Sequence, residues 1–252
     1  MLKAYLDVGR KTDAEKTEEI ICVVATVFKP VAYKQFVRPW KRMLDKWGAS
    51  AFHATDFYSG GGEFERTTAE RKKWYEEDSR AIPSMIGKKL TRVTAMSFLT
   101  EEFKKVASPK WKETFGTDTY GIAVQLCMIS LGYWLKTTSP TERFSFVQES
   151  GDNGQGTINN MVEQFRNDPQ MGPHVRIASF ATRDKGAARG LEASDFVAWH
   201  WNKHYMDRIR KNDMAPRKDF AAFMKIAEAR ISTAFVSGEK LKYFFSVVED
   251  KL

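Results

Sequence analysis

Apolar runs along the chain predict a sheet that begins near the N-terminus. Residues 2–6 and 20–28 are rich in apolar and β-branched side chains, and a polar stretch over 9–19 separates them. This pattern predicts two antiparallel strands joined by an extended connection. Further strands are expected from the same signals, at 90–99, at 174–182 and, in the centre of the sheet, at 144–148.

Apolar residues at helical spacing predict helices between these strands. The first follows Pro30 and is expected to stop at Gly48, while the stretch 119–135 is apolar nearly all round and should be buried against the sheet. The other helices are expected after Thr67 or Thr68 and at 101–107, 157–165, 190–210 and 218–231. Neither a repeat nor a linker interrupts the pattern. The sequence therefore predicts one α/β domain, residues 1–252, with a mixed central sheet flanked by helices.

Three carboxylates stand out because of where the pattern places them. Asp195 lies in an otherwise apolar helical stretch, where an unpaired acid is costly to bury. Asp7 ends the first apolar run, and Glu149 ends the predicted central strand. Ligands usually bind at the carboxyl edge of an α/β sheet. Acids at strand ends and on a helix that packs over them can therefore converge on a divalent metal.

Composition and charge narrow the class of protein. With 42% hydrophobic and 29% charged residues, the chain is typical of soluble globular proteins. No run approaches the roughly twenty apolar residues of a membrane span, so no membrane partner is expected. The first residues carry no apolar core before a cleavage site, which predicts a cytoplasmic protein without a secretory signal. A net charge of +8 favours a polyanionic partner, and we expect nucleic acid.

The cysteines and histidines give weaker signals. Cys22 and Cys127 lie inside apolar segments and are expected to be buried thiols. His200 and His204 have the spacing of a zinc-protease helix without its glutamate, so surface or interface histidines are expected. His53 precedes a glycine-rich loop, where it is either a helix cap or part of a site.

Three segments, in order, resemble motifs of the DUF3800 family. Tyr5-Leu6-Asp7-Val8-Gly9 is similar to the family's opening Asp-Glu-Ser-Gly-like motif, and His53-Ala54-Thr55-Asp56 with the following glycines is similar to its middle motif. The stretch 191–198 resembles its last motif, an apolar-Gln-x-Ala-Asp helix start. The chain departs from the family at Val8, where a Glu is usual, and at 192–194, where Glu-Ala-Ser replaces a Gln and an Ala.

The resemblance implies a fold and a site. The family is similar in fold to the ribonuclease H-like superfamily, whose nucleases hold two divalent cations about 4 Å apart on carboxylates. Oxygen-only ligands imply Mg²⁺ or Mn²⁺. The implied catalytic residues are Asp7, Glu149, Asp195 and His53, and Asp56 would join the three acids as a metal ligand.

Three hypotheses about function follow. The first is a metal-dependent phosphodiesterase that cleaves DNA or RNA. The second is a non-catalytic module that binds nucleic acid or protein with a degenerate site, which Val8 favours. The third is an assembly role, a homodimer included, in which Trp199, Trp201 and Tyr205 form an oligomer surface. Packing of an amphipathic helix is the simpler explanation of these aromatics.

Overall fold

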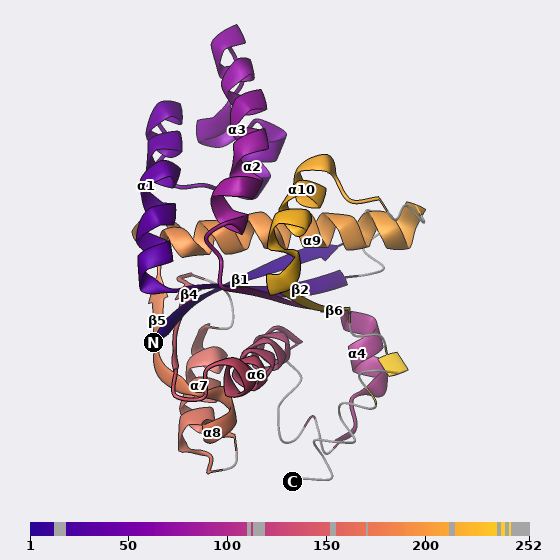
Figure 1. Cartoon of the computed structure of the whole chain (residues 1–252). Coiled ribbons are helices and arrows are strands. Elements are labelled where there is room, and N and C mark those ends of the chain that lie inside the picture. The colour runs from indigo at the N-terminus through magenta and orange to yellow at the C-terminus, as the bar shows by residue number, and fades with distance from the viewer. Residues whose placement is uncertain are drawn as a thin grey trace.

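A six-stranded mixed sheet organises the chain in the computed structural model, which describes residues 1–12, 19–109, 112, 119–151, 155–169, 171–211, 215–235, 238–239 and 242. The strand order is β5-β4-β1-β2-β3-β6. Helices cover both faces of the sheet (Figure 1), so the predicted α/β class with a mixed, helix-flanked sheet is confirmed. The strands are β1 (Leu2–Thr12), β2 (Glu19–Phe28), β3 (Arg92–Leu99), β4 (Phe144–Glu149), β5 (Ile177–Arg183) and β6 (Ile231–Phe235).

Strand β1 joins the antiparallel and parallel parts of the sheet. It pairs with β2 in the predicted antiparallel orientation, over residues 3–12, and with β4 in parallel over residues 2–6. Since β4 also runs parallel to β5, these three strands present their carboxyl ends at one edge. Strand β4 stops at Glu149 while β1 continues, so Asp7 lies where β1 leaves this neighbour.

The helices form two layers, one on each face of the sheet (Figure 1). One layer contains α1 (Pro30–Trp47), α2 (Ala54–Ser59), α3 (Ala69–Gly87), α9 (Arg189–Lys211) and α10 (Lys218–Ala227). The other contains α4 (Thr100–Val106), α6 (Thr119–Thr138), α7 (Gln155–Asn167) and α8 (Gly172–Val175). None of the described helices is long and apolar enough to cross a membrane.

Side-chain alternation along β1 separates the two cores. Tyr5 belongs to the core beneath α9, whereas Ala4 and Leu6 belong to the core beneath α6. Because successive side chains of a strand point to opposite faces, Asp7 faces the same layer as Tyr5. The sequence therefore delivers this acid to the α9 face of the sheet.

Local signals set several helix boundaries and burial states as predicted. Pro30 opens α1, and Gly48 ends it in the left-handed conformation, with φ of 68°. The Thr68 hydroxyl accepts a hydrogen bond from the Arg71 amide, which caps α3. Cys22 and Cys127 are buried free thiols.

The C-terminal helix prediction is wrong beyond residue 227. Helix α10 ends at Ala227, a 3₁₀ turn η3 (Glu228–Arg230) follows, and β6 then pairs in parallel with β3. Apolar residues continue past Ala227, so helical spacing alone does not mark the change. Residues 231–235 form a strand because they pair with β3, which is distant in sequence.

Two further strand boundaries differ from those expected. The strand expected from residue 174 starts at Ile177, after the single turn of α8. The strand expected over residues 2–6 continues as β1 to Thr12, into the stretch expected to be a connection, so Asp7 lies within the strand. Both differences depend on tertiary pairing, which the apolar pattern does not encode.

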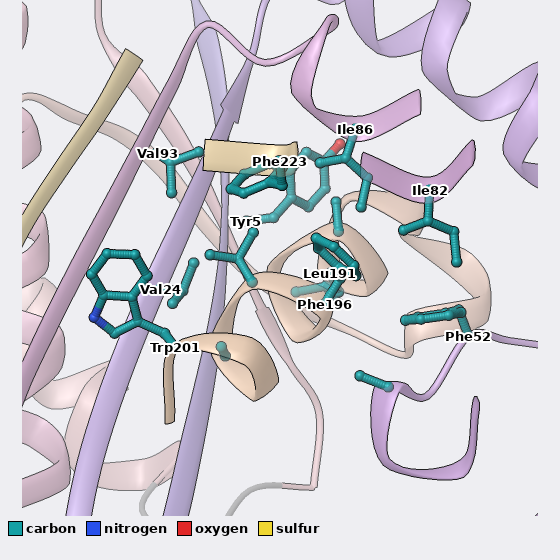
Figure 2. Close-up of a cluster of buried hydrophobic side chains, with 14 of the residues drawn as sticks. Tyr5, Val24, Phe52, Ile82, Ile86, Val93, Leu191, Phe196, Trp201 and Phe223 are labelled. Atoms are coloured by element: carbon teal, nitrogen blue, oxygen red, sulfur yellow. The ribbon is translucent and has the colours of Figure 1, made fainter. Parts of the chain in front are cut away.

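Helix α9 lies close to β1 and β2 because small residues line its inner face. A Cβ atom at Gly190 would lie 2.2 Å from Cδ2 of Tyr5, so only glycine fits there. One turn later, the Ser194 hydroxyl donates to the Tyr5 carbonyl oxygen over 2.7 Å, and its oxygen lies 2.7 Å from that of Thr26. Figure 2 shows Leu191 of the same helix and Tyr5 among the side chains of this core. Asp195, the next residue after Ser194, is thereby fixed over the sheet.

Replacing Gly190 by Ala should destabilise the protein, because the added methyl group fits against the Tyr5 ring only if α9 moves. We expect a loss of about 1 to 3 kcal/mol in the free energy of unfolding, the usual cost of overpacking. Urea denaturation measures this. The control is Gly156→Ala in α7, where nothing lies within 4 Å of the new Cβ, so stability should stay equal or rise. Equal stability of both variants would contradict the close packing of α9.

Candidate active site

Asp7, Glu149 and Asp195 converge on the ammonium group of Lys185. The Nζ atom lies 3.1 Å from Oε2 of Glu149, 3.2 Å from Oδ2 of Asp195 and 3.9 Å from Oδ1 of Asp7. The acids come from β4, α9 and β1, and the lysine opens η2 (Lys185–Ala187), just after β5. The structure thus brings together the three acids singled out in the sequence, around a cation that the sequence analysis missed.

This acid cluster is largely withdrawn from water. Lys185 is 9% exposed and Asp7 is 5% exposed, while Glu149 and Asp195 are half-buried. Burial alone lowers the pKa of Lys185, but the charges of Asp7, Asp195 and Glu149 outweigh it and raise the pKa above its usual range. The lysine is therefore a charged partner for all three acids.

The first turn of α2 also holds Asp195. The backbone N–H of Ala54 donates to Oδ2 of Asp195 over 2.9 Å, the same oxygen that contacts Lys185. A carboxylate at a helix N-terminus is stabilised by the unpaired amides there. Asp195 therefore has two partners, and these offset the cost of burying its charge among apolar residues.

His53 and Asp56 are close in sequence to Ala54, whose amide binds Asp195. His53 precedes α2 as its N-cap residue, is exposed, and its side chain makes no capping hydrogen bond. Asp56 is half-buried in α2, and its Oδ2 lies 3.3 Å from the position that a Cβ on Gly62 would take. In the described part of the chain, the ion pairs of Lys185 go to Asp7, Glu149 and Asp195 and not to Asp56.

Glu192 fixes the chain that leads into α2. Its carboxylate is fully buried and accepts hydrogen bonds from the Phe52 amide over 3.1 Å, from Nη1 of Arg189 over 2.6 Å and from the indole N–H of Trp40. Burial raises its pKa, and Arg189 opposes this rise. A carboxylate accepts hydrogen bonds at both of its oxygens, whereas a Gln side chain accepts at one. A Glu at position 192 therefore suits three donors better than a Gln would.

The expectation of a surface histidine at position 200 is wrong. His200 is 1% exposed, and its Nε2 lies 2.9 Å from the Tyr58 hydroxyl and 3.5 Å from Oδ2 of Asp219. This contact ties α2 to α9 and α10. The helical spacing of the surrounding apolar residues pointed to burial at this position, and the imidazole obscured the signal.

The neighbouring aromatics pack inside the molecule. Trp199 stacks on Tyr58 with ring centroids 4.4 Å apart, while the side chains of Trp201 and Tyr205, also on α9, are buried. Their side chains are used in packing within the chain, as the simpler explanation from the sequence predicted. They therefore give no support to an oligomer surface.

The acid cluster has the oxygen ligands that a hard divalent cation prefers, but its carboxylates are spaced around the ammonium group of Lys185. Three carboxylates are ligands that Mg²⁺ and Mn²⁺ prefer. The oxygens now lie 3.1 to 3.9 Å from Nζ, whereas Mg²⁺ requires about 2.1 Å. In line with this spacing, no group of three or more His, Cys, Asp or Glu side chains in the described chain is arranged to hold a metal. The donors fit a metal if the cluster contracts around it.

Comparisons with known proteins add no family to this geometry. Neither the models of protein families nor the curated proteins give a match to the chain.

His200 should make stability depend on pH below neutrality. Burial lowers its pKa to about 3, against about 6.5 in the unfolded chain, so between these values only the unfolded chain takes up the proton. Stability should fall as the pH falls, by up to about 1.4 kcal/mol per pH unit from this residue.

Denaturation of wild type and His200→Gln between pH 4.5 and 6.5 measures this contribution. The variant should lose stability less steeply than wild type as the pH is lowered. His53→Gln, which removes an exposed imidazole, is the control and should keep the wild-type slope. Identical slopes for wild type and His200→Gln would contradict a buried neutral imidazole.

Proposed function

We propose that the chain is a metal-dependent phosphodiesterase that cleaves DNA or RNA, with the acid arrangement of the ribonuclease H-like and DUF3800 proteins. One observation carries the proposal. Carboxylates from β1, from the end of β4 and from α9 meet at a single cation position. Such convergence costs free energy through mutual repulsion unless a cation lies among the acids.

The position of the acid cluster and the net charge of the chain support this proposal. The acid cluster lies at the carboxyl end of β4, next to the middle of β1, and α/β sheets usually bind ligands at the carboxyl ends of parallel strands. The chain carries 40 basic and 32 acidic residues, which favours a polyanionic substrate. A basic molecule with a local acidic site attracts a phosphate backbone and can still hold a metal against it.

Each residue of the site has a distinct task in this proposal. Asp7, Glu149 and Asp195 would hold Mg²⁺ or Mn²⁺ through oxygen atoms. A bound metal would supply activation of water and stabilisation of the leaving oxygen. The amide of Ala54 orients Asp195 through its hydrogen bond. His53 is exposed beside the cluster, where it can contact water or a phosphate, and Asp56 remains an accessory ligand.

A second candidate is a non-catalytic module that binds nucleic acid or protein. The observation in its favour is that the ammonium of Lys185 already satisfies the three acids. Val8, where the resembled motif has a Glu, removes a further acid from the same strand. In this reading the basic surface binds, and the acid cluster is a buried ion-pair network.

Asp195→Asn should abolish most of the cleavage activity without unfolding the protein. Asn keeps the shape and can still accept the Ala54 hydrogen bond, but it lacks the charge that would hold a metal. We expect a rate at least about a hundredfold lower, as for loss of one electrostatic contribution to the transition state. The assay measures cleavage of single- and double-stranded DNA and RNA with Mg²⁺ or Mn²⁺, and chelator should stop it.

The matched control is Asp45→Asn, because Asp45 is exposed and pairs with Lys41 on the surface of α1, away from the acid cluster. This variant should cleave like wild type. Salt-sensitive binding without metal-dependent cleavage by wild type would favour the non-catalytic module. Full activity of Asp195→Asn would remove the acid cluster from the reaction.

A further inference from the structure

Lys185 is buried to an extent that a lysine tolerates only with strong partners. Lysine is almost never fully buried unless paired, and each buried charge costs several kcal/mol of desolvation. Here the side chain is 9% exposed and contacts three carboxylates from three different elements. The acid cluster and the lysine thus depend on each other, since three acids at one point would otherwise repel one another.

The ammonium stands at the point where the three acids meet. A metal ligated by Asp7, Glu149 and Asp195 together would have to occupy that point, because the nearest oxygens of all three lie within 3.9 Å of Nζ. Metal–oxygen distances of about 2.1 Å leave no room for an ammonium among the same oxygens. The lysine and a metal bound by all three acids therefore exclude each other.

We propose that Lys185 is a built-in counter-ion that competes with a divalent cation for the acid cluster, and that metal binding displaces its side chain. The inference rests on the proposed function, since it assumes that these acids take up a metal. In the metal-free protein the lysine neutralises part of the cluster and keeps the fold stable. Metal then enters by exchange for an ammonium rather than into an open site.

The surroundings of Lys185 allow the exchange. Its residue opens the short turn η2, and the neighbouring residues Asp184, Gly186 and Ala187 are exposed. The turn is closed by backbone hydrogen bonds from Ala187 and Ala188 to the carbonyl of Asp184, which do not involve the lysine side chain. A four-carbon stem with free rotation can therefore carry the ammonium outward while the backbone stays in place.

Metal affinity of a charge-free variant tests the competition directly. Lys185→Met keeps an unbranched apolar stem and removes the charge. If the ammonium occupies the position in about nine molecules of ten, its removal should tighten the apparent Kd for Mn²⁺ about tenfold. Isothermal titration calorimetry with Mn²⁺ measures this. Lys185→Arg keeps the charge and should stay near the wild-type affinity.

Thermal unfolding gives a second measurement on the same variants. Without metal, Lys185→Met should melt below wild type, because three acids lose their counter-ion. Mn²⁺ should raise its melting temperature more than that of wild type, since it binds the folded form more tightly. The control Lys41→Met removes an exposed lysine that pairs with Asp45 and should match wild type in both measurements.

A labelling experiment on the wild type covers the case in which Lys185→Met does not fold. Acetic anhydride should modify Lys185 slowly in the metal-free protein, because the amine is buried. Mg²⁺ should accelerate this modification, read by mass spectrometry against Lys41, if it displaces the side chain. Unchanged labelling of Lys185 at a Mg²⁺ concentration that saturates the protein would overturn the competition.

The outcomes separate this inference from the proposed function. Tight Mn²⁺ binding by Lys185→Met with none by wild type supports the competition and argues against a metal enzyme. Equal binding by both proteins overturns the competition and leaves the proposed function standing. Absence of Mn²⁺ binding in every folded variant overturns both.

Discussion

The close contact between α9 and β1 is the constraint on which the candidate site depends. Gly190 has no side chain to hold the helix away from Tyr5, and Ser194 bonds to the strand through its hydroxyl. This contact brings Asp195 over the carboxyl end of the parallel strands, where Asp7 and Glu149 point to the same face. A larger residue on the inner face of α9 would lift the helix and separate the acids.

Once the backbone has brought the acids together, charge becomes the main problem of the site. Three largely buried carboxylates at one point need cations, and the chain provides one in Lys185. The amide of Ala54 adds a fixed dipole at Asp195. Glu192 also stabilises this arrangement, because it binds the amide of Phe52, two residues before Ala54. The site is thus preorganised by contacts that do not themselves bind a ligand.

The sequence predicted those parts of the molecule that depend on short-range patterns. Strand β1 and Asp7 at its apolar end follow from the apolar run, and α9 follows from helical spacing with an acid in an apolar stretch. Lys185 escaped prediction because it lies in a short turn after β5, where no periodicity marks it. Only the parallel pairing of β4 with β5 brings that turn to Glu149, and this pairing is a contact distant in sequence.

The same limit explains the other errors. Strand β6 follows a helix of the same apolar character, and its pairing with β3 is what makes it a strand. His200 looked like a surface residue because a histidine is polar, yet its position on α9 faces Tyr58 and Asp219. Residues whose role depends on a partner from another element are therefore the ones that pattern alone leaves open.

Anomalous diffraction from crystals grown with and without Mn²⁺ tests the central claim most directly. We expect one manganese peak bounded by Asp7, Glu149 and Asp195, with the Lys185 side chain turned away from them. Without Mn²⁺, the ammonium should lie among the same three carboxylates, as it does now. Manganese bound elsewhere, with Lys185 still paired to all three acids, would contradict the account.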